Sequence, residues 1–470
     1  QPNFKLPISQ FNYWRNSEFS KRRTNDTTDF DPLSRDGAQE AYRQKRNNDA
    51  FRIGALFRDK FAVLAPKPPE PSRSMRDENE WWNSMGKEEV NHVEDVRGVK
   101  LKQDLEMKQS AVLFNEGHKM TSMVRFHPFE TLLVACDGRD KVSIWDYSTN
   151  RRVSFMNGNP KKSRMTTSAW LNSTSKGLLM IGSDDGSVRI WDRTVSPNGS
   201  ILNETPALAS AFFAAPDMES GIVGGSGLVC EWQQHAGRLV AGGDSRVVRC
   251  WDVEAEKCIQ ELDRGNDGCI TTLTSTWTYD PFHSDISPEG YHGISPDVMI
   301  AGYGNGHLKV FDLRLDSGPV ASFSPFGLPV PTNRKYKYTS FNEHSSWIVN
   351  ASLTDYNSRN EIVSGCVAGV VKHWDLRVQS SLRTFVVQRS QMTAATFHRS
   401  IPMMASGSHT QFINLRSMDG DALQVMRYHE GMGGRRIGPV SCLVFHPFKP
   451  LLAAGCTDEI VSLYEPKSPL

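Results

Sequence analysis

Three groups of residues in this sequence have types and spacings that enzymes use for catalysis or for ligand binding. Gly224-Gly225-Ser226-Gly227-Leu228 resembles the sharp turn that presents a nucleophilic serine, but the second glycine of that motif is missing. Gly302, Gly304 and Gly306 alternate like the glycines of a phosphate-binding loop. They fall at an expected hairpin turn and not at the start of a helix, so neither motif predicts a site.

The third group comprises the histidines and cysteines. Phe-His-Pro occurs at 126–128 and again at 445–447, at equivalent strand ends, which favours a structural role over a metal site. The eight cysteines form no C-x-x-C pair, so neither a zinc site nor a disulfide framework is predicted. Cys250, Cys366 and Cys456 fall in expected strands as buried thiols of a reducing compartment. We therefore expect no enzyme, catalytic residue, cofactor or metal.

Charge and hydropathy exclude further classes of function. The 54 basic and 53 acidic side chains nearly cancel, which argues against general attraction to nucleic acid. No long uninterrupted apolar stretch predicts direct insertion into a membrane. The sequence starts at Gln1, and we interpret it as a fragment of a longer protein.

A repeat organises the chain from residue 109 onward. An aromatic residue followed by an acid recurs, and a glycine stands nine residues before the aromatic position in six of seven units. The pairs are Trp145-Asp146, Trp191-Asp192, Trp251-Asp252, Phe311-Asp312, Trp374-Asp375, a degenerate Arg416-Ser417 and Tyr464-Glu465; the glycines are Gly182, Gly242, Gly302, Gly365, Gly407 and Gly455. Units of this length are typical of four-stranded propeller blades.

The sequence thus predicts an all-β, seven-bladed WD-repeat propeller at 109–467, preceded by a charged, partly helical and partly irregular arm at 1–108. The strand near 111–114 is expected to close the last blade, whose other strands come from 439–465. Asp185-Gly186 is expected to form a tight turn with positive φ at both residues. Residues 36–61 and 75–87 are candidate helices of the arm.

The propeller departs from the usual WD pattern in two ways. The Gly-His pair that bonds toward the aspartate of the WD pair is present at Gly117-His118 but missing from most blades, so the usual hydrogen bond of this pair is not predicted for most blades. Insertions at 278–297 and 325–338 are rich in Pro, Gly and aromatic residues, which indicates surface loops that are either tolerated decoration or partner contacts. Candidate partner-binding residues in expected loops are Arg334, Tyr336, Arg435 and Arg436.

Four longer strings resemble the Raptor family, the regulatory-associated proteins of the target of rapamycin kinase. They are 158–166, 343–353, the run from Tyr428 to Pro447, and Arg76 to Trp81 in the arm. The resemblance implies the C-terminal part of a scaffold subunit of target of rapamycin complex 1, which helps to assemble the kinase complex and presents regulators or substrates. It implies the kinase complex and its regulators as partners, and a cytoplasmic protein recruited to the lysosomal or vacuolar surface through partners.

One alternative is a substrate receptor of a cullin-type ubiquitin ligase. Phe311-Asp312-Leu313-Arg314 and Trp374-Asp375-Leu376-Arg377 resemble the paired W-D-x-R box of such receptors. Propeller geometry alone often produces this box, and the Raptor-like strings are longer. A nucleic-acid-binding propeller is the other alternative, and the neutral charge argues against it.

Overall fold

The computed structural model of the 470-residue chain describes residues 106–467 with gaps. The gaps are 116–119, 174–176, 193, 195–205, 219–223, 235, 246, 254, 256, 263–267, 276–296, 314–320, 324–343, 355–360, 376–380, 400 and 431–433. The expected helices at 36–61 and 75–87, the insertion at 325–338 and all of the insertion at 278–297 except Asp297 lie outside the described residues.

Strands form seven four-stranded sheets within this part of the chain, and neighbouring strands in each sheet are antiparallel wherever a register is given. Their strands in chain order are β1 (Met107–Phe114); β2 (Met123–Phe126), β3 (Leu132–Cys136), β4 (Lys141–Asp146), β5 (Arg151–Met156); β6 (Met165–Leu171), β7 (Leu178–Ser183), β8 (Ser187–Asp192), β9 (Ala207–Phe213); β10 (Leu228–Gln233), β11 (Arg238–Gly243), β12 (Val248–Asp252), β13 (Lys257–Leu262); β14 (Ile270–Ser275), β15 (Val298–Tyr303), β16 (Leu308–Asp312), β17 (Ala321–Phe323); β18 (Ile348–Thr354), β19 (Glu361–Cys366), β20 (Val370–Asp375), β21 (Ser381–Val386); β22 (Met392–Phe397), β23 (Met403–Ser408), β24 (Phe412–Ser417), β25 (Ala422–Met426); β26 (Val440–Phe445), β27 (Leu452–Cys456) and β28 (Ile460–Pro466).

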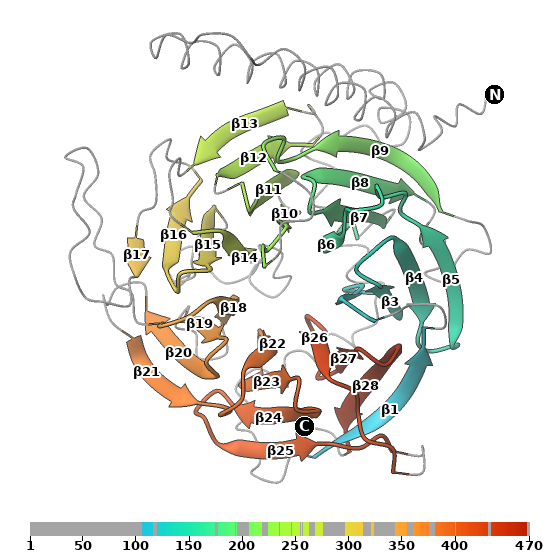
Figure 1. Ribbon diagram of the computed structural model, residues 1–470, viewed down its shortest axis with the longest axis vertical. Coiled ribbons are helices and arrows are strands. Elements are labelled where there is room, and N and C mark those ends of the chain that lie inside the picture. The colour runs from blue at the N-terminus through green and yellow to red at the C-terminus, as the bar shows by residue number, and fades with distance from the viewer. Residues whose placement is uncertain are drawn as a thin grey trace, which may run out of the picture.

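The sheets are arranged as blades around a central opening (Figure 1). One end strand of each sheet lies nearest the centre, as β6 and β26 do, and the other end strand lies at the rim, as β9 and β1 do. The second strand of the first blade, β3, has the sequence LLVAC and is buried at every position, because neighbouring blades cover both faces of the sheet. The predicted all-β seven-bladed propeller is confirmed, and each repeat unit corresponds to one blade.

The recurrent glycine keeps the space that the next blade needs. A Cβ atom on Gly407 would lie 2.4 Å from Val440 Cγ1, and one on Gly182 would lie 2.8 Å from Leu228 Cδ2. Both contacts are with the innermost strand of the following blade, and both are closer than carbon atoms can approach without a shift. A side chain at this position would therefore push two blades apart.

The hairpin turn between β7 and β8 differs from its prediction in one detail. Gly186 has a φ of 79°, but Asp185 is not among the residues with positive φ. Three residues separate the strands, and the Gly186 N–H donates to the Ser183 carbonyl at 2.9 Å. Since a three-residue loop needs one left-handed position and not two, glycine is required only at the second predicted position.

The ring is held shut where the two ends of the described chain meet. β1 is the outer strand of the blade formed by β26, β27 and β28, and its register with β28 runs from Met107↔Pro466 to Phe114↔Ile460. Gln424 of the preceding blade bonds to both backbone groups of Met107, at 2.7 Å to the nitrogen and 2.9 Å to the oxygen. β1 thus ties the last two blades together and covers the edge that β28 would expose.

The tryptophans of the repeat use different hydrogen-bond acceptors in different blades. Trp374 Nε1 donates to Ser364 Oγ at 2.8 Å, and the same oxygen lies 2.7 Å from His344 Nε2. Trp145 donates instead to Asn115 Oδ1 at 2.7 Å, and Trp251 donates to the Ala214 carbonyl at 3.0 Å. The chain departs from the usual pattern without leaving these three indole N–H groups unsatisfied.

Candidate protein-binding surface

One face of the ring carries two kinds of connection in every blade. Strands alternate in direction, so the link that enters the innermost strand and the turn between the second and third strands lie at the same end of each blade. In the first two blades these connections are the turn 137–140, the loop 157–164 and the turn 184–186. We call this side the loop face, and the other side the opposite face.

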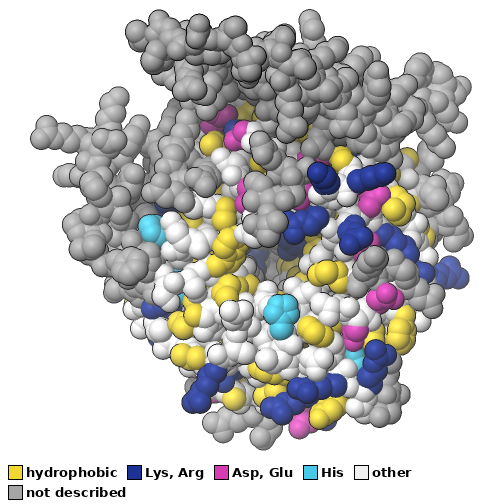
Figure 2. Space-filling model, viewed as in Figure 1, with side chains coloured by type: hydrophobic (Ala, Val, Ile, Leu, Met, Phe, Trp, Pro, Cys, Tyr) yellow, Lys and Arg dark blue, Asp and Glu magenta, His cyan; other side chains and the backbone are white. Residues whose placement is uncertain are grey.

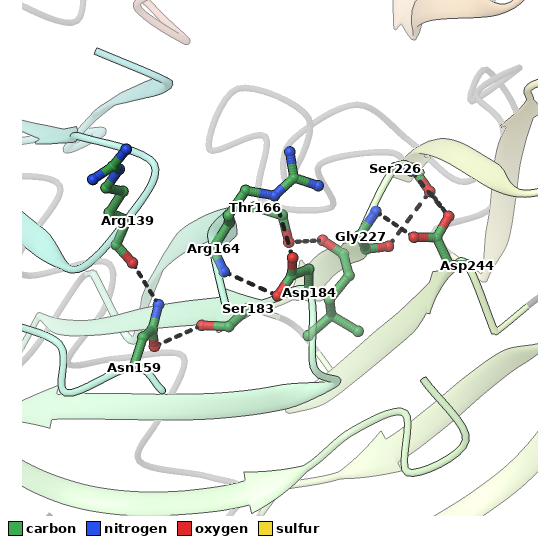
Figure 3. Close-up of polar contacts among 10 residues, drawn as sticks. Arg139, Asn159, Arg164, Thr166, Ser183, Asp184, Ser226, Gly227 and Asp244 are labelled. Atoms are coloured by element: carbon green, nitrogen blue, oxygen red, sulfur yellow. Dashed lines mark hydrogen bonds and ion pairs between the residues drawn. The ribbon is translucent and has the colours of Figure 1, made fainter. Parts of the chain in front are cut away.

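Turn carboxylates fasten the loops of this face to their blades. Asp184 Oδ1 accepts the backbone N–H of Arg164 at 2.9 Å, and Arg164 Nε lies 3.2 Å from Asp184 Oδ2. Asp244 repeats the arrangement in the next blade, accepting the N–H groups of Ser226 and Gly227, each at 2.9 Å (Figure 3). These charge-assisted bonds hold the loops in one position.

The loop 157–164 is also fixed from its other side. Asn159 donates through Nδ2 to the Arg139 carbonyl at 2.8 Å, and its Oδ1 accepts from Ser183 Oγ at 3.0 Å (Figure 3). Arg189, whose side chain is buried, donates to the same Asn159 oxygen at 2.9 Å. The loop that carries the first Raptor-like string is therefore a fixed part of the surface.

Exposed cations crowd the loop face beside this network. Arg139, Lys161, Lys162 and Arg164 are exposed, and all four belong to the connections between β3 and β4 and between β5 and β6. Figure 2 shows Lys and Arg side chains gathered beside the central depression of the ring. Rigid loops with exposed cations suit the binding of a protein surface of opposite charge.

The structure places two of the four predicted partner-binding residues. Arg435 and Arg436 lie in the loop between β25 and β26 on the loop face, and both are exposed. Arg436 Nη2 donates to the Thr410 carbonyl at 3.2 Å, so this arginine also supports the neighbouring turn. Arg334, Tyr336 and the W-D-x-R arginines Arg314 and Arg377 lie outside the described residues.

The opposite face carries three buried histidines, His127, His398 and His446, which we call the turn histidines. His127 Nδ1 accepts the N–H of Glu130 at 2.9 Å, and His446 Nδ1 accepts that of Lys449 at 3.0 Å. Burial lowers the pKa of His127 and His398 to about 4 and that of His446 to about 3. Uncharged rings that cap turns have a structural role, as the repeated Phe-His-Pro predicted.

The glycine motifs singled out by spacing also have structural explanations. Ser226 Oγ donates to Asp244 Oδ1 at 3.1 Å, within the loop network described above. Gly306 has a φ of 84° in the turn between β15 and β16, where a Cβ atom would lie 2.3 Å from the His344 carbonyl oxygen. Within the described ranges, no group of three or more His, Cys, Asp or Glu side chains is placed to hold a metal ion.

No helix in the described part of the chain has the length and hydropathy that crossing a membrane requires. All eight cysteines are free, and Cys250, Cys366 and Cys456 are buried in strands as the sequence indicated.

Comparison with known proteins agrees with this architecture. The family model "WD domain, G-beta repeat" matches residues 156–192 and 434–465. The raptor homologue of Dictyostelium discoideum is 30% identical over 349 residues, which is 73% of this chain and 20% of that protein. The target of rapamycin complex 1 subunit mip1 of Schizosaccharomyces pombe is 31% identical over 342 residues, 72% of this chain and 23% of its own length.

A solved structure also resembles this chain and belongs to a Raptor protein. The crystal structure of Chaetomium thermophilum Raptor superposes with a TM-score of 0.60 at 27% sequence identity, covering 77% of this chain and 29% of that one. The chain spans about a fifth of the length of the curated relatives that it matches. It is therefore a homologue of the Raptor proteins over their C-terminal WD-repeat region.

Proposed function

We propose that this chain is the propeller region of a non-catalytic scaffold that takes part in target of rapamycin complex 1. The observation that carries the proposal is an alignment over 72% of this chain with a yeast protein named as a subunit of that complex. Relatives from a slime mould and a plant, Dictyostelium discoideum and Arabidopsis thaliana, align over a similar share, 73% each. The shared part is thus most of the chain and not one repeat.

The mechanism that the geometry supports is rigid display. Binding to a surface that is already ordered costs less conformational entropy than ordering flexible loops on contact. The carboxylates of Asp184 and Asp244 provide that order on the loop face, and the exposed Lys161 and Lys162 provide charge. The chain would contribute by holding partners in place, with no covalent step.

The extent and the partners of this region are part of the proposal. We assign the propeller to 109–467 and a separate arm to 1–108, and we propose Arg334, Tyr336, Arg435 and Arg436 as partner contacts. The partners would be the target of rapamycin kinase complex and its regulators. The chain would act in the cytoplasm and be recruited by them to the lysosomal or vacuolar surface.

An affinity pull-down from lysate with the full 1–470 chain, read by mass spectrometry, tests this function. Recovery of the target of rapamycin kinase is the expected result. Recovery of a cullin ligase adaptor without the kinase would replace the proposal with the substrate-receptor function. If neither is recovered, the proposed part in the kinase complex is wrong for this region.

A further inference from the structure

A cavity of about 410 Å³ opens between the fifth and sixth blades, and its lining residues fall between Val387 and Arg427, away from the contacts of Asp184 and Asp244. Its walls come from the loop between β21 and β22, the turn between β23 and β24, the strands β24 and β25, and Arg427 directly after β25. Its lining includes Arg389, Ser390, Thr410, Phe412, Val425 and Arg427. Its volume is within the range of small ligand pockets.

The lining of this cavity is positively charged. Arg389 and Arg427 are both exposed and stand on different segments, and none of the lining residues is Asp or Glu. Neither guanidinium forms an ion pair with an acidic side chain within the described part of the chain. Two unpaired arginines that line one cavity favour an anion with several acceptor oxygens.

Hydroxyl groups and a fixed wall complete the polar part. Ser390 Oγ and Thr410 Oγ1 lie 3.4 Å apart, and Thr410 Oγ1 also contacts Ser408 Oγ, so the two lining hydroxyls belong to a cluster whose protons can turn toward a ligand. The carbonyl of Thr410 accepts from Arg436, and the buried Asn414 donates to the Val387 carbonyl at 3.2 Å. The wall and floor are therefore held in place by bonds to the protein before any ligand binds.

Apolar side chains also line the cavity, and a free anion would not use them. Phe412 and Val425 belong to the lining, and Val425 is 47% exposed. Large apolar side chains exposed together mark interaction sites more often than chance surface. A cationic cavity that also has exposed apolar lining residues matches a peptide that carries one phosphate and apolar neighbours.

We propose that this cavity binds a phosphorylated serine or threonine in an extended segment of a protein partner. The phosphate lies between Arg389 and Arg427, Ser390 and Thr410 donate to its oxygens, and an adjacent side chain of the peptide packs on Phe412 and Val425. The inference deepens the proposed scaffold function, on which it rests, because it assigns one class of partner to one site. Phosphorylation of the partner would then control docking.

The test measures binding of fluorescein-labelled peptide pools to the full chain by fluorescence polarisation. One pool has a fixed phosphoserine between randomised positions, and the matched pool has serine. We expect the phosphoserine pool to bind at least about tenfold more tightly, and R389A and R427A each to weaken it by about 10- to 100-fold. R383A is the matched control, since Arg383 is an exposed arginine of β21 in the fifth blade that is paired with Asp419 and does not line the cavity.

Several outcomes would overturn the proposal. Equal binding of the two pools, or an equal loss with R383A, would show that the cavity does not read a phosphate. Displacement by free inorganic phosphate or by anionic lipid vesicles as readily as by unlabelled phosphopeptide would remove the peptide as the occupant. If the chain binds the phosphopeptide tightly but recovers no kinase in the pull-down, the proposed function is refuted and the site is not. If it recovers the kinase but binds no phosphopeptide, the site is refuted and the proposed function is not.

Discussion

The hydrogen-bond relay of the fifth blade makes a quantitative prediction about stability. Ser364 is fully buried, and its hydroxyl accepts from Trp374 Nε1 at 2.8 Å and lies 2.7 Å from His344 Nε2. Replacing Ser364 with alanine removes the one hydroxyl that both rings contact, while both rings remain buried. Each unsatisfied group costs about 1–3 kcal/mol, so with two groups we expect S364A to lower the free energy of unfolding by about 2–6 kcal/mol.

The sixth blade provides a matched control. Ser406 occupies the same register position, directly before the recurrent glycine, and is also buried. Its hydroxyl donates only to Gln388 Oε1, at 3.3 Å, and no tryptophan follows in that blade's repeat position. S406A leaves one group without its bond, where S364A leaves two, and should therefore cost about half as much, about 1–3 kcal/mol. Urea denaturation followed by far-UV circular dichroism gives both values, and equal losses for the two variants would refute the relay as a source of stability.

Three further predictions concern packing, closure and pH. G407A should cost about 1–3 kcal/mol because the new Cβ would lie 2.4 Å from Val440 Cγ1, and the double variant G407A/V440A should lose less than the sum of the single variants in urea. Deleting residues 1–115, which removes β1, should abolish cooperative melting in calorimetry, whereas deleting 1–105 should not; equal melting curves would contradict this account of ring closure. The turn histidines have folded pKa values of about 4, 4 and 3 against an ordinary 6.5, so the unfolded chain takes up protons first as the pH falls. Above pH 6.5 the free energy of unfolding contains their full contribution, and below pH 6.5 it falls by up to about 1.4 kcal/mol per histidine per pH unit. Urea midpoints that stay constant from pH 7 to 5 would contradict this prediction.

The sequence was sufficient to predict the architecture because one physical requirement repeats. Each blade needs a small residue where the next blade packs, which puts Gly182, Gly242 and their equivalents at one offset. Each blade also needs an apolar third strand, such as the Val188 and Ile190 of β8, between its neighbours. Requirements that recur at fixed spacing can be recognised from the sequence alone.

The hydrogen bonds inside the blades could not be predicted in the same way. Trp145 bonds to Asn115, thirty positions upstream, and Trp251 bonds to a backbone oxygen of Ala214. Both acceptors come from links between blades, and those links differ in length from blade to blade. A residue type gives no signal when its partner is a carbonyl group.

The candidate sites illustrate the same limit. The loop-face contacts of Asp184 and Asp244 had a weak signal, an aspartate two residues after the recurrent glycine, which sequence reasoning did not use. No sequence motif or spacing relates Arg389 to Arg427, because they line one cavity only after β21 to β25 have folded against each other. Spacing along one strand is local, whereas a cavity between blades depends on tertiary structure.

The most direct test of the scaffold account compares two charge reversals on opposite faces of the ring. K161E/K162E changes exposed residues of the loop face, and R151E/K257E changes exposed residues where β5 and β13 begin on the opposite face. The measurement is the amount of the target of rapamycin kinase complex that each full-length variant recovers from lysate, with melting temperatures to confirm folding. The account predicts a large loss for K161E/K162E and none for R151E/K257E. Recovery unchanged by K161E/K162E, or lost equally with both, would contradict it.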